Sequence, residues 1–286
     1  MSSWRERNER AVLALRAEPW AARLVASVNR RGIRWEEEDF LFELRYAHDL
    51  VRAGLRVEYE SPTGMGNSSV DFKIAADVPW LVELVRLRES AAVKAATVFE
   101  KLPSGLIVET LNLSSHAGVV DPARAEATPQ HELLRVTQKL GDKVFDGKKP
   151  IKFPKPDGSA FHMILMDMRG FEGMGFPDRD DCRQIVGGPR MVSPSMFVAY
   201  HPETGEPIHG VWDPDNSSTA ARLLRERVHV IGFVHEQKYC DDEIRDATVI
   251  FLNPEFFGPS DKTTYPLRAA PESLPARGKN SLWGAG

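Results

Sequence analysis

Two short apolar segments, each interrupted by a single carboxylate, constrain this chain of 286 residues more than any other feature. Residues 69–75 read SVDFKIA and residues 80–86 read WLVELVR, a composition that predicts two strands of one sheet. The interrupting acids are Asp71 and Glu83. A carboxylate on such a background is unfavourable unless it is paired, protonated or bound to a metal, so both positions require a partner.

A third acid of this kind lies on the segment that precedes them. Residues 35–53 predict a helix with an apolar arc made of Phe40, Leu44, Ala47 and Val51. Glu43 falls inside that arc, whereas Arg45, Asp49 and Arg52 are expected on the opposite face. Glu43 is therefore either a buried acid that pairs with an Arg or caps a chain end, or a carboxylate aimed at a site.

The other segments predict an alternation of helices and strands. Helices are expected over residues 1–31, 89–102 and 129–145, and from Ser217 or Ser218 onward. Strands are expected over residues 56–60, 105–113, 160–168, 197–200, 208–212, 228–234 and 248–252, with the remainder of 171–215 in loops. Together they predict an α/β fold with a central mixed sheet and helices on both sides.

The chain divides into four parts by this reading. Residues 1–33 form an N-terminal helical extension, residues 34–170 an α/β core, and residues 171–258 a C-terminal α/β extension packed on the core. Residues 259–286 are rich in Pro, Ser and Gly and are expected to form a flexible tail.

Composition excludes several classes of protein. The net charge of −4 argues against a broadly basic surface that coats nucleic acid, although it allows a local basic groove. The two cysteines, Cys182 and Cys240, provide neither a disulfide framework nor a thiolate metal cluster. The N-terminus lacks an apolar signal core, and no run reaches the ~18 apolar residues of a membrane span. We therefore expect a cytoplasmic protein with no membrane partner.

Three acids interrupt apolar patterns on consecutive predicted elements: Glu43, Asp71 and Glu83. Oxygen ligands suit Mg²⁺ or Mn²⁺. Such an ion positions a water, lowers its pKa and neutralises charge on a phosphodiester. A hydrolase of this kind also needs a cation near the attacking water.

This arrangement resembles the PD-(D/E)XK nuclease superfamily, which has the restriction-endonuclease-like fold. The resemblance covers residues 35–170 and lies in the order of a helix with an acid, a loop, two acid-bearing strands, helices and a buried strand. It implies that Glu43 matches the helix acid, Asp71 the motif Asp and Glu83 the motif Glu. It further implies metal-dependent cleavage of nucleic acid, with DNA favoured over RNA, and leaves a homodimer as an open alternative.

One position departs from the family. The motif Lys belongs two residues after the second acid, where this chain has Val85, and a Val cannot orient a water. Either the cation has migrated or catalysis has been lost. The substitutes are Lys139 and Lys143 on the later helix and Lys94 on the nearer one, with Gln138 as a polar neighbour. In a catalytically inactive module that binds nucleic acid or a protein, Lys143 would instead pair with the acids.

Other sites have weaker support. The basic segment 148–155 is either a solvated linker or an edge that contacts phosphates. A zinc site at His229 and His235 lacks a third ligand at useful spacing. No Ser in an elbow-like motif accompanies the His residues, and Gly64-Met65-Gly66 does not open a helix as a phosphate-binding loop does.

Overall fold

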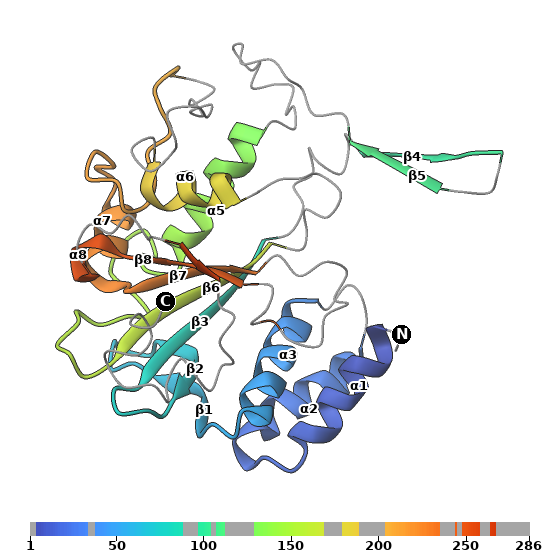
Figure 1. The fold of residues 1–286 in the computed structure, drawn as a ribbon. Helices are drawn as coiled ribbons and strands as arrows, with labels where there is room; N and C mark the ends of the chain where they lie inside the picture. The colour runs from blue at the N-terminus through green and yellow to red at the C-terminus, as the bar shows by residue number, and fades with distance from the viewer. Residues whose placement is uncertain are drawn as a thin grey trace.

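The computed structural model describes residues 4–33, 38–87, 97–103, 107–111, 129–168, 179–188, 204–234, 244, 248–257 and 264–266. Seven strands form one mixed sheet across the molecule (Figure 1). In spatial order they are β1 (Val57–Pro62), β2 (Ser69–Ile74), β3 (Trp80–Arg86), β6 (Phe161–Asp167), β7 (Val230–Val234), β8 (Thr248–Leu252) and β9 (Thr264–Pro266).

The sheet combines both pairing modes. β1, β2 and β3 form an antiparallel meander, and β3, β6 and β7 run parallel to one another. β8 and β9 follow in antiparallel pairs. The predicted α/β fold with a central mixed sheet is therefore confirmed.

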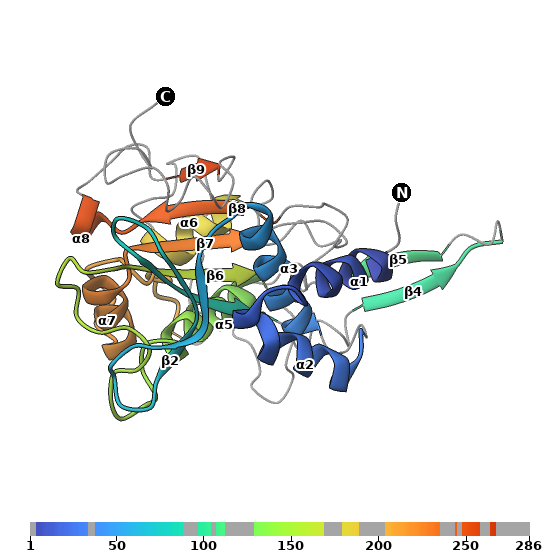
Figure 2. The ribbon, with the colours of Figure 1, turned by 90° about the horizontal axis from the view of Figure 1, so that it is seen from below.

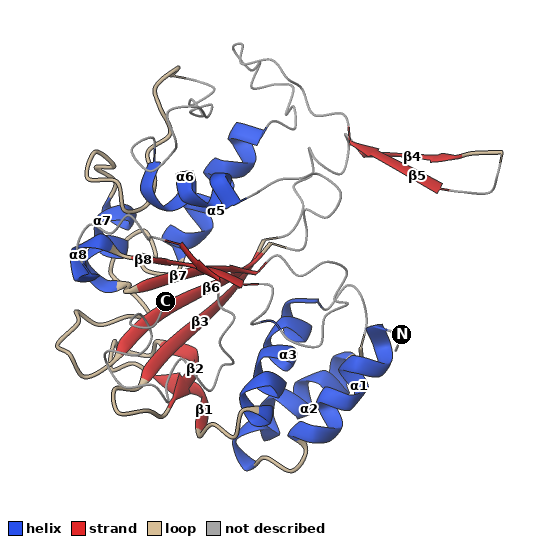
Figure 3. Cartoon of the chain, viewed as in Figure 1, coloured by secondary structure: helices blue, strands red, loops and turns tan. Residues whose placement is uncertain are grey.

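Helices cover both faces of this sheet (Figures 2 and 3). On one side are α1 (Trp4–Leu15), a short 3₁₀ helix (Pro19–Ala21), α2 (Ala22–Arg31) and α3 (Glu38–Arg52). On the other are α5 (Pro129–Asp142), α6 (Arg179–Gly187) and α7 (Thr219–Arg227). Alternate side chains of β3 enter the two cores: Val82 and Leu84 face the first group, and Leu81 and Val85 face the second.

The face of α3 opposite the apolar arc is partly buried, although Arg52 on it is exposed. Arg45 is 6% exposed and Asp49 is 5% exposed. α1 packs along α3, and the Asp49 Oδ2 atom accepts the N–H of Ile244 at 2.8 Å. A helix covered from two sides needs polar partners on its second face, which periodicity within the helix does not reveal.

The helix predicted over 89–102 is wrong for its last residues, and residues 89–96 lie outside the described part of the chain. β4 (Thr97–Lys101) is a strand that pairs with β5 (Ile107–Leu111) in a separate antiparallel hairpin. Both views show the hairpin projecting from the body (Figures 1 and 2). The β-branched and aromatic residues Thr97, Val98 and Phe99 favour a strand over the helix that the preceding alanines suggested.

The segment 171–215 contains two further differences. α6 occurs where only loops were expected, and residues 208–212 form no strand. The backbone N–H groups of Val211 and Trp212 donate instead to the carbonyls of Ile185 and Val186, at 2.9 and 2.7 Å. This segment therefore closes the last turn of α6 rather than joining a sheet.

The ends of the chain extend the same architecture. The helices expected over 1–31 are present, and Ser218 caps α7 by accepting the N–H of Ala221. β9 is a strand inside the segment expected to be a flexible tail, and the other residues of 259–286 lie outside those described. Within the described ranges, no helix has the length and apolar character needed to cross a bilayer. The four-part division of the chain stays a prediction.

Candidate metal and phosphate site

The central feature is a divergence of two strands. β2 and β3 are paired only as far as Phe72 and Val82. Beyond that pair, β2 continues along β1 and β3 continues along β6. The first residues past it are Asp71 and Glu83, so both acids sit where the strands diverge. We call this opening the strand fork.

Asp71 occupies the fork itself. Its Oδ2 atom accepts the backbone N–H of Leu84 at 2.6 Å, which replaces the ladder hydrogen bond that the diverging strands no longer make. Burial raises the pKa of Asp71 to about 8, and the nearby charges of Glu83 and Glu43 raise it further than the Leu84 hydrogen bond lowers it. A proton or a cation is therefore favoured at this carboxylate.

Glu83 is 1% exposed and is satisfied on one side only. Its Oε1 atom accepts a hydrogen bond from the Nζ atom of Lys143 at 2.7 Å and lies 3.2 Å from the Nζ atom of Lys152. Its Oε2 atom is buried and has no hydrogen-bond partner among the described residues. A buried carboxylate oxygen without a partner is unfavourable, and a cation or a hydrogen-bond donor would satisfy it.

Lys143 carries its charge at the fork. Burial alone would lower the pKa of Lys143, but the charge and hydrogen bond of Glu83, together with Asp71 and Glu43, raise it above its ordinary value. Lys143 is therefore a fixed ammonium at neutral pH. It can donate hydrogen bonds and stabilise negative charge, but it is unsuited to accept a proton.

Glu43 reaches the fork from α3 and is held by a tyrosine rather than by an arginine. The Tyr59 hydroxyl donates a 2.6 Å hydrogen bond to the Glu43 Oε2 atom. Burial raises the pKa of Glu43 to about 6; the Tyr59 hydrogen bond opposes this shift, and Glu83 reinforces it. The apolar arc of α3 thus delivers a half-buried carboxylate to the site.

Two backbone outliers border the fork. Glu60 and Lys152 are the non-glycine residues with positive φ in the described chain, at 52° and 65°. Glu60 falls between the Tyr59–Phe72 and Ser61–Val70 pairs of β1 and β2, and its charge raises the pKa of Glu43. Residues other than glycine rarely adopt a backbone with positive φ, and such backbone strain concentrates at functional sites.

The structure brings together four of the five predicted site residues: Glu43, Asp71, Glu83 and Lys143. Lys139, the fifth, lies on the exposed face of α5, as does Gln138. Lys94 lies outside the described residues. Val85 is 3% exposed and packs among apolar side chains, so the position of the motif lysine contributes only to the core.

Two residues of the site were not predicted. Tyr59 belongs to an expected strand, but its hydroxyl contact depends on how α3 crosses the sheet. Lys152 stands in the segment 148–155, for which a phosphate-contacting edge was one of two readings. Nothing in the order of residues distinguishes Lys152 from its neighbours, because only the backbone path aims its side chain inward.

The ligand geometry for a metal is mixed. Among the described residues, only His209, Asp213 and Asp215 have ligand atoms that all lie within 4.8 Å of one another. The oxygens of Glu43, Asp71 and Glu83 are therefore spread wider than one closed shell. Their fit to a cation comes from their charge and from the orphan oxygen of Glu83, which are the features that a hard dication satisfies.

The compact group at His209 is already internally bonded. Asp213 is 1% exposed; its Oδ2 atom lies 2.9 Å from the His209 Nδ1 atom, and its Oδ1 atom accepts the Asp215 N–H at 3.0 Å. Asp213 thus stabilises a turn. The alternative zinc site is not supported either, since the His229 Nδ1 atom accepts the His162 N–H at 3.0 Å and His235 lies outside the described residues.

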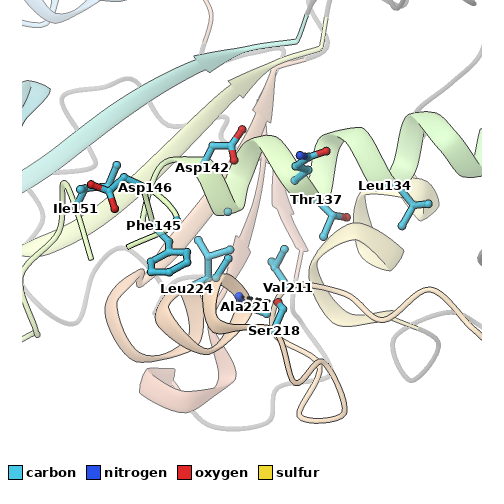
Figure 4. Close-up of a pocket in the computed structure, with 14 residues that line it drawn as sticks. Leu134, Thr137, Asp142, Phe145, Asp146, Ile151, Val211, Ser218, Ala221 and Leu224 are labelled. Carbon is cyan, nitrogen blue, oxygen red and sulfur yellow. Dashed lines mark hydrogen bonds between the residues drawn. The ribbon is translucent and has the colours of Figure 1, made fainter. Parts of the chain in front are cut away.

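A cavity of about 790 Å³ lies apart from the carboxylates, between α5, α7 and the loop after α5 (Figure 4). Leu134, Phe145 and Leu224 give it an apolar lining. Two of its polar groups serve local structure: the Ser218 hydroxyl caps α7, and Asp146 accepts the N–H groups of the two residues after Gly147. We therefore place the candidate chemistry at the fork and not in this cavity.

Fold and site together define a mixed α/β protein with three clustered carboxylates and two ammonium groups at a strand fork. No protein-family model, curated protein or solved structure matches the chain.

Proposed function

We propose that the chain is a metal-dependent phosphodiesterase that cleaves nucleic acid, with DNA favoured over RNA. The observation that carries this proposal is the 2.7 Å contact between Lys143 and Glu83, beside Asp71 and the orphan Glu83 Oε2 atom. The Lys143 ammonium, from the turn after α5, reaches the second acid, which is the role that the resemblance gives to a lysine on the strand. This supports the view that the catalytic ammonium has moved to Lys143, since Val85 occupies the usual position of the motif lysine.

The order of elements supports the same assignment. α3, the β1–β2–β3 meander, α5 and the strand β6 parallel to β3 follow the order that the PD-(D/E)XK superfamily shares. On this basis we propose that the core has the restriction-endonuclease-like fold, with β7, β8 and β9 extending its sheet.

Asp71 and Glu83 would hold the cation, Mg²⁺ or Mn²⁺, and Glu43 would complete the shell through water. Mg²⁺ usually keeps several waters and needs only one or two protein carboxylates, so a spread set of acids is sufficient. When bound, the ion would lower the pKa of a coordinated water and neutralise charge on the phosphate. Tyr59 fixes the Glu43 carboxylate in its orientation.

The charge at the fork suits this substrate. Three carboxylates and two ammonium groups leave one negative charge when all five are ionised. A dication would reverse that sign and leave one positive charge, which equals in size the single negative charge of a phosphodiester. Lys143, as a fixed donor, would orient the attacking water and stabilise the hydroxide that forms from it.

The test is cleavage of plasmid DNA, single-stranded DNA and RNA with Mg²⁺, Mn²⁺ or EDTA. We expect metal-dependent cutting that falls at least ~100-fold in Asp71→Asn and in Lys143→Met. Lys139→Met removes the same charge from the exposed face of α5 and should keep the wild-type rate. The absence of cutting with every metal, or full activity in Asp71→Asn, would refute the proposal.

A catalytically inactive module that binds nucleic acid or a protein is the second candidate. The observation in its favour is that two ammonium groups already neutralise Glu83. It predicts a gel shift with DNA that does not depend on Mg²⁺, together with no cleavage of any substrate.

A further inference from the structure

Lys152 is held at the fork by a strained turn. Its φ is 65°, and the N–H of Phe153 donates to the carbonyl of Ile151 at 2.8 Å. A hydrogen bond across one residue with positive φ defines a γ-turn of the rarer and more strained form. The chain therefore adopts an unfavourable backbone at the one residue of this loop whose ammonium reaches Glu83.

The residues on both sides enforce this turn. The Ile151 N–H donates to the Val144 carbonyl at 2.9 Å. Phe153 is fully buried, and its carbonyl accepts a 2.8 Å hydrogen bond from Arg227. Lys152 is thus fixed between two anchored neighbours, which is the condition under which strain persists in a native structure.

Glu83 does not need this second ammonium. Lys143 already donates to its Oε1 atom at 2.7 Å, whereas Lys152 approaches the same oxygen at 3.2 Å and leaves Oε2 without a partner. Two like charges on one oxygen repel each other. The Lys152 side chain is also 25% exposed, so its ammonium lies at the boundary between the fork and solvent.

We infer that Lys152 binds the substrate phosphate, which rests on the proposed function and adds a residue to it. In the free protein Glu83 holds the Lys152 ammonium in place. When a nucleic-acid strand enters, the ammonium exchanges its ion pair with the Glu83 Oε1 atom for a hydrogen bond to a non-bridging oxygen of the phosphodiester. No covalent bond or proton is exchanged in this step, and Glu83 becomes available to the cation.

The experiment compares Lys152→Met with Lys152→Arg and with Lys155→Met, which removes an exposed charge from the same loop. Affinity for a fluorescein-labelled DNA duplex is measured by anisotropy in Ca²⁺, and Mn²⁺ affinity is measured by calorimetry without DNA. Thermal melting of each variant checks that the fold is kept.

Lys152→Met should weaken DNA binding by about tenfold, while Mn²⁺ binds as tightly as to wild type or more tightly because a competing ammonium is gone. Lys152→Arg should recover most of the DNA affinity, and Lys155→Met should change it by less than about twofold. Equal loss in Lys152→Met and Lys155→Met, or wild-type DNA affinity in Lys152→Met, would overturn the inference.

The outcomes also separate this inference from the proposed function. If wild type cuts DNA and Lys152→Met binds and cuts as wild type does, the function stands and the role of Lys152 is wrong. If wild type cuts nothing but Lys152→Met loses DNA binding, phosphate binding by Lys152 stands and the hydrolase is wrong.

Discussion

Asp71 holds a proton at neutral pH in the cation-free protein, because its pKa is raised to about 8. Its ordinary pKa in the unfolded chain is about 3.9, so the native state binds more protons between these values. The contribution of Asp71 to the free energy of unfolding is therefore fully present below pH ~4 and is lost as pH rises toward 8. Glu43, with its pKa raised to about 6, acts in the same direction.

Asp71→Asn should remove most of this dependence, because an amide needs no proton. In EDTA we expect the melting temperature of wild type to fall between pH 5 and pH 8.5, and the variant to melt ~5 °C higher at pH 8.5. Asp77→Asn, an exposed position in the turn after β2, is the control and should follow wild type. A variant that melts below wild type at pH 8.5 would contradict the assignment of the proton to Asp71.

Metal and proton compete for the same carboxylates. Mn²⁺ affinity, measured by calorimetry, should rise between pH 6 and pH 8, approaching about tenfold per pH unit, and level off above. This rise should disappear in Asp71→Asn, whose remaining affinity should be weaker at every pH. An affinity that is independent of pH in wild type would mean that the cation binds elsewhere.

At the scale of elements, α5 must lie close to α7 for Lys143 to reach the fork. A Cβ atom at Gly141 would lie 2.9 Å from the Cβ atom of Ala220, so only glycine allows this approach. Gly141→Ala should destabilise the protein by about 1–2 kcal/mol in urea unfolding, despite the better helix propensity of Ala.

The compensating change is Ala220→Gly. The double variant should recover the wild-type packing distance and cleavage rate. Its stability should stay slightly lower, because glycine has a poorer helix propensity than alanine in α7. If Gly141→Ala were as stable as wild type, the close crossing of α5 and α7 would not be what positions Lys143.

Elements with strong periodicity could be read from the sequence, and elements that depend on long-range contacts could not. Apolar patterns of their own mark the strands bearing Asp71 and Glu83, the helix bearing Glu43, and α5, which ends one residue before Lys143. The β4 strand was missed because alanines before it favour a helix. The inward path of Lys152 was missed because it depends on Ile151 and Phe153 being anchored by distant partners.

At the scale of the whole molecule, an acidic protein is proposed to bind a polyanion through a local basic rim. Lys148 and Lys149 are exposed at the start of the loop that carries Lys152, and we call them the basic rim. With so few phosphate contacts, log K for duplex DNA should fall with log salt with a slope of about −3 to −4. Replacing both rim lysines by Glu should lower both affinity and slope, whereas the control Arg16→Glu, at an exposed residue near the end of α1, should do neither.

The left-handed backbone at Lys152 means that a change which raises thermal stability at this position would lower activity. Glycine adopts that conformation without strain, so Lys152→Gly should relax the turn while it discards the ammonium. A random library selected only for survival of heating would therefore be expected to enrich glycine at position 152 among proteins that no longer cut DNA.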